Sequence, residues 1–313
     1  MRKQLDKDKY ENKIKSYAEV LKEYYPEPWL VYSLVRNKKM TKLEWIFDFL
    51  VGAGTVELAD SLNDSSPYYL VKKDNLKMLE KATKFLKDYV NDVLSKENKM
   101  HVSYDLWEMY EGVHLYSLAA IFAAFSSMIK IYNVLGKNVS DFENNRLKEE
   151  KVHKNILELE ELQVKVKNYI DEKLYDENRK SYVRNANDRK IDISLLGAVY
   201  PFNVFSSKEK KVLNTIDNIN LTIRTYTGGY QRYEYDHYRN CSPWPIANLW
   251  MTLYYLENGE KKKAKETFDF VLKTAGKHSF LGEQIDNNTL KPNWVIGLGW
   301  SHAMFIIVLE KMS

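Results

Sequence analysis

Apolar residues recur at steps of three and four along most of this chain, and this periodicity limits what it can fold into. Ile14, Tyr17 and Leu21 show the pattern early in the chain, and Leu249 and Leu253 show it late. Such steps place the side chains on one face of an α-helix, and that face must pack against other apolar surfaces. We therefore predict an all-α fold, with helices over 8–25, 41–62, 74–96, 112–134, 148–175, 207–219, 244–257, 260–276 and 299–312.

The connections between these helices are alternately short and long, which favours antiparallel helix pairs arranged as a toroid. Strand patterns are few, and no stretch has the composition of a linker. We therefore predict a single domain over residues 1–313. About ten helices are recognisable in total, which leaves an incomplete toroid as an open alternative.

Charge and cysteine content narrow the cellular setting. The 313 residues include 47 basic and 43 acidic side chains, and a net charge of +4 demands no nucleic-acid partner. The single cysteine, Cys241, excludes an internal disulfide and fits a reducing compartment. Residues 1–15 lack the apolar region of a secretory signal, and the longest apolar run, Leu115 to Phe125, is too short to span a membrane. We predict a cytoplasmic protein without a membrane partner; its oligomeric state stays open.

Two glutamates in aromatic settings are the strongest candidates for chemistry. Glu108 ends residues 104–108 (Tyr-Asp-Leu-Trp-Glu), just before the most apolar helix, and Glu283 lies in a predicted loop between two helices. Inverting glycosidases use one carboxylic acid to protonate the leaving oxygen and one carboxylate to activate water. Aromatic walls stack on sugar rings and raise the pKa of an acid. The pair therefore fits an acid and a base, against the alternatives of a helix-start carboxylate and a solvated loop carboxylate.

Several further motifs, taken in order along the chain, resemble glycoside hydrolase family 15, the glucoamylase family. The resemblance covers residues 74–313 and leaves residues 1–73 as divergent N-terminal helices. After the acid-bearing segment 104–108, it is carried by Asp192–Leu196, Gly228–Tyr233, Ser242–Pro245, Leu281–Gln284 and Leu298–Ala303.

This resemblance implies an (α/α)6 toroid that releases glucose from the non-reducing end of α-glucosides such as maltooligosaccharides, with inversion. Glu108 would be the general acid and Glu283 the general base, and neither a metal nor another cofactor is implied. The oligosaccharide substrate would contact Asp105, Trp107, Arg232, Tyr233 and Trp244, and Trp300 would support the loop of the base. For Arg232, a simple ion pair with Glu234 or Asp236 is the alternative.

The chain also departs from the family pattern. Residues 1–73 contain no Trp-x-Arg-Asp segment of the kind that grips the sugar, and Met109 stands where the family often has a second glutamate. Two alternatives follow, a catalytically impaired carbohydrate-binding remnant or half of a split enzyme. Another helical-toroid enzyme, such as a glycoside lyase-like or trehalose-cleaving relative, is a third. The histidines lack metal-ligand spacing, and His114 and His302 are interpreted as structural.

Overall fold

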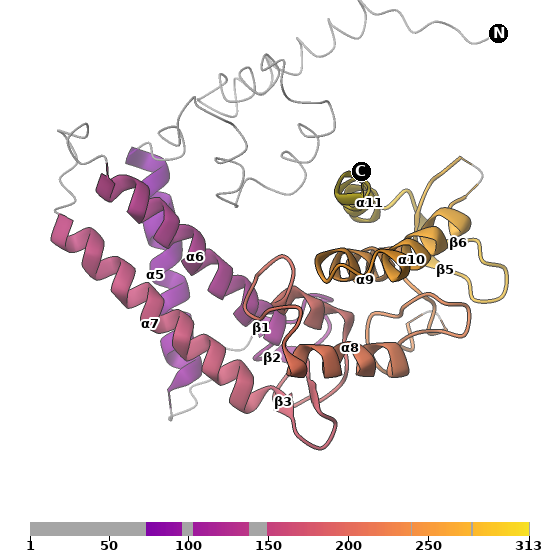
Figure 1. Cartoon of the computed structure of the whole chain (residues 1–313), viewed down its shortest axis with the longest axis horizontal. Helices are drawn as coiled ribbons and strands as arrows, with labels where there is room; N and C mark the ends of the chain where they lie inside the picture. The colour runs from indigo at the N-terminus through magenta and orange to yellow at the C-terminus, as the bar shows by residue number, and fades with distance from the viewer. Residues whose placement is uncertain (1–72, 96–102, 138–148, 239, 277, 313) are drawn as a thin grey trace, which may run out of the picture. The chain divides into compact units, whose positions relative to one another are not determined.

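The computed structural model describes residues 73–95, 103–137, 149–238, 240–276 and 278–312. Helices dominate this part of the chain, and three short antiparallel hairpins join them (Figure 1). The elements in chain order are α5 (Lys73–Leu94), β1 (Ser103–Tyr104), β2 (Glu111–Gly112), α6 (Leu115–Lys137), α7 (Glu149–Lys173), β3 (Tyr175–Asp176), β4 (Ser181–Tyr182), η3 (Ile193–Ala198), α8 (Lys210–Thr222), α9 (Pro245–Glu257), α10 (Lys261–Thr274), β5 (Gly282–Ile285), β6 (Pro292–Ile296) and α11 (Gly299–Met312).

The helices α5, α6 and α7 pack side by side (Figure 1). The most extensive contact is between α6 and α7, where Leu118 and Phe125 of α6 are buried together with Leu159 and Val166 of α7. Ala119, also fully buried, has a side chain small enough to let a neighbouring helix approach closely. The predicted apolar periodicity is therefore what holds this group together.

One stretch of α6 is more apolar than the sequence-based expectation allowed. Among the described helices, Leu115–Asn133 is the one that is long and apolar enough to cross a membrane, by length and composition only. The apolar run identified in the sequence, Leu115 to Phe125, is therefore shorter than the apolar stretch of the helix. Leu118, Phe125 and Met128 of this stretch are buried against other parts of the chain. The absence of a membrane partner stays a prediction.

The 3-10 helix η3 connects the two groups of helices, because it contacts both α6 and α9. It begins where the Asp192 carboxylate accepts a hydrogen bond from the Ser194 amide at 2.8 Å, which satisfies a backbone donor at the helix start. Every residue of η3 is buried. The apolar run from Ile193 to Ala198 therefore forms part of the core.

The C-terminal helices form a second group around α9. Pro245 stands at the first turn of α9, where the missing amide hydrogen costs nothing. One neighbour is α10, reached after a turn at Gly259, whose φ of 79° suits glycine. A buried hydrogen bond of 2.8 Å between the hydroxyls of Thr252 and Thr267 joins α9 to α10, and α11 packs against α9 as well.

The predicted helices from residue 74 onward are confirmed, with ends that differ by a few residues. Those at 8–25 and 41–62 lie outside the described residues. The predicted loop around Glu283 is wrong, because Glu283 lies in β5, which pairs with β6. Strand β5 is only four residues long and lacks the alternation that would mark it in the sequence.

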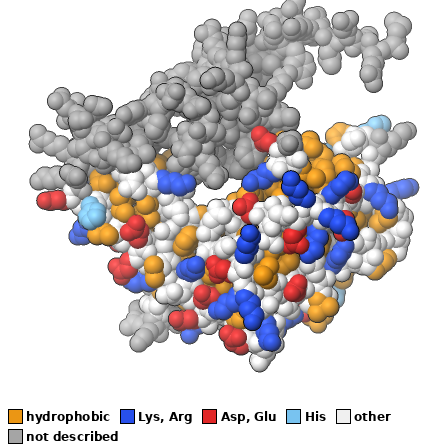
Figure 2. Space-filling view, in the orientation of Figure 1, with side chains coloured by type: hydrophobic (Ala, Val, Ile, Leu, Met, Phe, Trp, Pro, Cys, Tyr) orange, Lys and Arg blue, Asp and Glu red, His pale blue; other side chains and the backbone are white. Residues whose placement is uncertain are grey.

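Acidic and basic side chains both occur across the face drawn in Figure 2, with apolar side chains between them. This face therefore presents charges of both signs. The absence of a nucleic-acid partner was predicted from the charge balance of the sequence and stays a prediction.

Candidate active site

Glu108 lies in the tight turn that connects β1 to β2. We call residues 105–110 the Glu108 turn. Its ends meet in a hydrogen bond of 2.9 Å from the Asp105 amide to the Tyr110 carbonyl oxygen. The Asp105 carboxylate lies inside the turn and accepts hydrogen bonds from the amides of Met109 at 2.7 Å and Tyr110 at 3.2 Å. Asp105 is buried, whereas the Glu108 side chain is exposed.

The backbone of Glu108 is strained. Its φ of 56° lies in the left-handed region, which costs a residue with a side chain about 1–3 kcal/mol unless the surroundings fix it. Such strain concentrates at functional sites. A glycine at this position would adopt the same backbone at lower cost, but it would have no carboxyl group.

Trp107, the residue before Glu108, is the centre of a group of aromatic rings. We name this group the tryptophan cluster: Trp107, Trp244, Trp250 and Trp300. The ring centroids of the other three lie 5.8, 6.0 and 5.9 Å, in that order, from the ring of Trp107. The cluster joins the Glu108 turn to the start of α9 and the start of α11. Trp107 and Trp244 are buried, and Trp300 is 37% exposed.

Asp192 fixes the indole ring of Trp107 by hydrogen bonds. The indole Nε1 of Trp107 donates to both carboxylate oxygens of Asp192, at 3.1 and 3.2 Å. Asp192 is almost completely buried, and this burial raises its pKa to about 6. The Ser194 amide, the charge of Arg184 and the Trp107 indole all oppose the shift, because each favours the charged carboxylate.

The raised pKa of Asp192 predicts a specific dependence of stability on pH. Because the folded-state pKa of about 6 exceeds the ordinary 3.8, the folded chain holds this proton more tightly than the unfolded chain. The resulting stabilisation is fully present below the ordinary pKa and is lost as the pH rises through the folded one. One pKa unit is worth about 1.4 kcal/mol, so from pH 4 to 7 the free energy of unfolding should fall about 2–3 kcal/mol more in the wild type than in Asp192→Asn.

Urea unfolding of both proteins across this pH range measures the effect. Equal pH dependence in the two proteins would show that Asp192 takes up no extra proton on folding.

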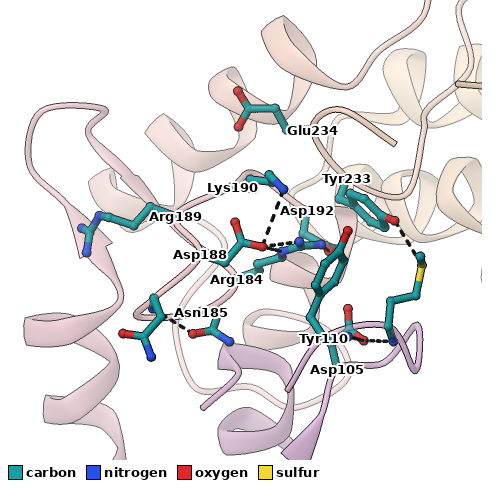
Figure 3. A network of polar contacts seen from close by, with 12 residues as sticks. Asp105, Tyr110, Arg184, Asn185, Asp188, Arg189, Lys190, Asp192, Tyr233 and Glu234 are labelled. Carbon is teal, nitrogen blue, oxygen red and sulfur yellow. Dashed lines mark hydrogen bonds and ion pairs between the residues drawn. The ribbon is translucent and has the colours of Figure 1, made fainter. Parts of the chain in front are cut away.

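Arg184 reaches Asp192 from between two tyrosine rings (Figure 3). Its guanidinium carbon lies 4.4 Å from the ring centre of Tyr110 and 4.5 Å from that of Tyr233. The Arg184 Nη1 lies 3.5 Å from the Asp192 carboxylate, and the opposite edge of the guanidinium binds Asp188. A planar cation suits this place, because it stacks on aromatic faces and binds carboxylates along its edges.

Arg232 is buried in a bidentate ion pair. Its Nε and Nη2 donate to the two carboxylate oxygens of Asp236, both at 2.9 Å. Glu234, the other predicted partner, binds Arg179 instead. The Arg232 guanidinium also lies within 5.4 Å of the ring centres of Trp107, Tyr233, Tyr238 and Trp244. The ion pair with Asp236 is therefore present, and the substrate contact of Arg232 stays a prediction.

Glu283 is half-buried in β5, and both ends of this strand are anchored. The Ile285 amide donates to the Pro243 carbonyl oxygen at 2.8 Å, directly before the start of α9. The Leu281 amide donates to the imidazole Nε2 of His302 on α11 at 3.1 Å. Glu283 is thereby tied to the two helices that bear Trp250 and Trp300.

Other residues near the two glutamates have structural roles. His302 anchors the strand of Glu283, and the support expected from Trp300, its neighbour on α11, stays a prediction. The Tyr233 hydroxyl donates to the sulfur of Met109 at 3.1 Å, so Tyr233 contacts the Glu108 turn. No sequence motif points to Arg184, and Asp192 stands out only as part of the segment Asp192–Leu196. The Asp that precedes an apolar run was the one visible signal for this pair.

Several buried polar atoms near the tryptophan cluster have no hydrogen-bond partner within the described part of the protein. A buried polar atom without a partner costs about 1–3 kcal/mol. Atoms of this kind beside aromatic rings suit a polar ligand with several hydroxyl groups. They are Asp105 Oδ2, Trp244 Nε1, Gln284 Oε1 and Ser301 Oγ.

No group of three or more His, Cys, Asp or Glu side chains within the described ranges has a geometry that could hold a metal ion. The Cys241 sulfur lies 4.0 Å from His237 Nδ1. Burial, followed by the negative charge of Asp236, raises the pKa of the Cys241 thiol and so disfavours a reactive thiolate.

Comparison with known proteins gives one family and several relatives. The model of the glycosyl hydrolases family 15 matches residues 63–277, a range that includes Glu108 and ends before Glu283. An uncharacterized glycosyl hydrolase of Methanocaldococcus jannaschii is 30% identical in an alignment of 253 residues that covers 73% of this chain and 38% of the relative. Trehalase 1 of Sulfolobus acidocaldarius is 26% identical over 135 residues, 42% of this chain and 24% of the relative. This chain thus spans less than half the length of either relative.

The structure is similar to solved glucoamylases. For the glucoamylase of Saccharomycopsis fibuligera the TM-score is 0.58 at 13% identity, over 86% of this chain and 67% of the other. At this identity the likeness concerns the helix-rich fold.

Proposed function

Since the chain belongs to glycosyl hydrolase family 15, we propose that it is an inverting glycoside hydrolase acting on α-glucosides, with Glu108 as general acid and Glu283 as general base. The observation that carries this proposal is the tryptophan cluster, which joins the Glu108 turn to the two helices that anchor the strand of Glu283. An acid and a base on separate supports around an aromatic surface suit a sugar ring between them.

The reaction needs both groups at once. Glu108 gives its proton to the leaving oxygen as the glycosidic bond breaks, and Glu283 takes a proton from the water that attacks the opposite face of the sugar carbon. Inversion requires about 6.5–9.5 Å between the two carboxyl groups, to leave room for that water. Asp105, Trp107, Arg232, Tyr233 and Trp244 are the proposed contacts of the sugar.

The proposal also covers the fold of the chain and the cellular compartment in which it acts. The chain forms one domain of the (α/α)6 toroid type, as in the glucoamylases that it resembles in fold, and acts in the cytoplasm. Glucose released from non-reducing ends of maltooligosaccharides is the proposed product. Trehalose is a second candidate substrate, favoured by the similarity to Trehalase 1 of Sulfolobus acidocaldarius.

Proton NMR of the purified full chain with maltotriose, isomaltotriose and trehalose tests this proposal. We expect β-glucose to appear first from a preferred α-linked oligosaccharide, because inversion turns an α-linkage into a β-product. Trehalose would give equal α- and β-glucose. The same samples with Glu283→Gln should give no early product. The substrate that is cleaved identifies the linkage.

Three results would contradict parts of the proposal. Early α-glucose from maltotriose would mean retention instead of inversion. Shifts of sugar signals without any product would favour the carbohydrate-binding alternative, or a half-enzyme that needs a second chain. Equal cleavage by wild type and Glu283→Gln would remove Glu283 from the reaction.

A further inference from the structure

We propose that Arg184 and Asp192 are positioning residues that hold the Glu108 turn in the geometry required for proton transfer. This inference rests on the proposed role of Glu108 as the acid. Neither residue touches the reacting atoms in this proposal, and both act through the neighbours of Glu108.

The first contact lies on the N-terminal side of Glu108. Trp107 precedes it, and the indole of Trp107 is bound by both carboxylate oxygens of Asp192. Asp192 cannot move freely, because its carboxylate also caps η3 through the Ser194 amide and its backbone pairs with Tyr233. The core of the protein thus fixes the side chain that is adjacent to the acid.

The second contact lies on the C-terminal side. Tyr110 closes the turn, and the guanidinium of Arg184 holds its ring against that of Tyr233 (Figure 3). The Tyr233 hydroxyl in turn binds the sulfur of Met109. Arg184 is buried, and its own carbonyl oxygen accepts the hydrogen bond of 3.0 Å from the Leu115 amide that begins α6.

Glu108 itself needs such external support. Its side chain is exposed, and its φ of 56° is one that an unconstrained glutamate leaves. Relaxation of this single residue would swing the carboxyl away from the leaving oxygen. A displacement of about 1 Å can lower a rate about 100-fold, so loss of the network around Arg184 should lower the rate more than it weakens substrate binding through Trp107 and Tyr233.

The test compares Arg184→Lys and Asp192→Asn with a matched control, Glu234→Gln. Lysine keeps the charge but has no planar group to stack between tyrosines. Asparagine keeps an acceptor for Trp107 and loses the charge that faces Arg184. Glu234 is a half-buried carboxylate with an arginine partner, and it binds the Ile191 amide next to Asp192, but it contacts Arg179 rather than the Glu108 turn.

Two kinds of measurement are made on the full chain: hydrogen exchange of the Met109 and Tyr110 amides, and steady-state kinetics (kcat and KM) on the preferred substrate. In Arg184→Lys we expect amide exchange to rise about 10-fold or more and kcat to fall about 10- to 100-fold, a larger change than the rise in KM that a displaced Tyr233 would cause. Asp192→Asn should also raise amide exchange and lower kcat, but by less than Arg184→Lys does. Glu234→Gln should match the wild type in both.

Amide exchange tests the positioning inference, and the kinetics test the proposed function on which it rests. Unchanged amide exchange in Arg184→Lys and Asp192→Asn overturns the positioning inference, whether or not the protein hydrolyses sugars. Faster exchange with an unchanged kcat overturns its catalytic part. Faster exchange in a protein without hydrolase activity would contradict the proposed function, and with it the need for positioning, while leaving the structural hold on the turn established.

Discussion

Replacing Glu108 with glutamine is expected to lower kcat by about 10²–10⁴-fold with little change in KM, because general acid catalysis contributes about this much. Glutamine has nearly the same size as glutamate and keeps the hydrogen-bonding capacity, but it has no acidic proton to give. The exposed position of Glu108 means that folding should be unaffected. Initial rates on the preferred oligosaccharide, together with circular dichroism, measure both expectations.

A comparison of substrates with different leaving groups makes this test more specific for the general acid. An aryl glucoside with an acidic phenol needs little protonation, so Glu108→Gln should slow it much less than an oligosaccharide. Glu283→Gln should slow both substrates equally, because both need the activated water. Glu111→Gln is the matched control, since Glu111 is an exposed glutamate on β2 of the same hairpin. A loss in the control as large as that in Glu108→Gln would show a general effect of charge on this hairpin.

Asp236→Ala is expected to destabilise the protein by about 3–5 kcal/mol, the cost of removing one partner of a buried ion pair. Asp236 is fully buried, and Arg232 is only 5% exposed. The substitution leaves the guanidinium without its two hydrogen bonds of 2.9 Å. The aromatic rings around Arg232 offset part of this loss, because they attract a cation. Urea unfolding at neutral pH measures the change.

Asp269→Ala is the control for this experiment. Asp269 pairs with Lys265 on the surface of α10, also four residues apart, with both side chains well exposed. Exposed pairs of this kind contribute about 0.3–0.5 kcal/mol. Similar losses in the two variants would mean that water reaches Arg232 and takes over the role of Asp236.

The sequence predicted the helices well because their apolar spacing is a local property. In α10, for example, the buried residues Ala264, Phe268 and Val271 stand four and three positions apart, with exposed charged residues between them. Pro245 marks the start of α9. The hairpin of β5 and β6 has no such signal. Its strands are short, and a register irregularity falls between Gly282 and Gln284, at the position of Glu283.

The candidate site was predictable only in part. Glu108 and Glu283 were recognised through short motifs, and their catalytic roles remain predictions. The stacking of Arg184 between Tyr110 and Tyr233 joins segments that are far apart in the chain, so no local pattern reveals it. For Arg232, the sequence offered two acidic partners at short range, and only the fold distinguished Asp236 from Glu234.

The anchoring of β5 at both ends has a mechanical consequence. One end is bonded to the residue before the cap of α9, and the other to His302 on α11. The strand is therefore bonded to both of these packed helices. A change in the distance between the helices must move Glu283 as well. Ser301 on α11 is fully buried, so a larger side chain there would displace α11 from its neighbours. Remote substitutions at this interface are thus a route by which evolution or an engineer can retune the proposed base without altering any residue around it.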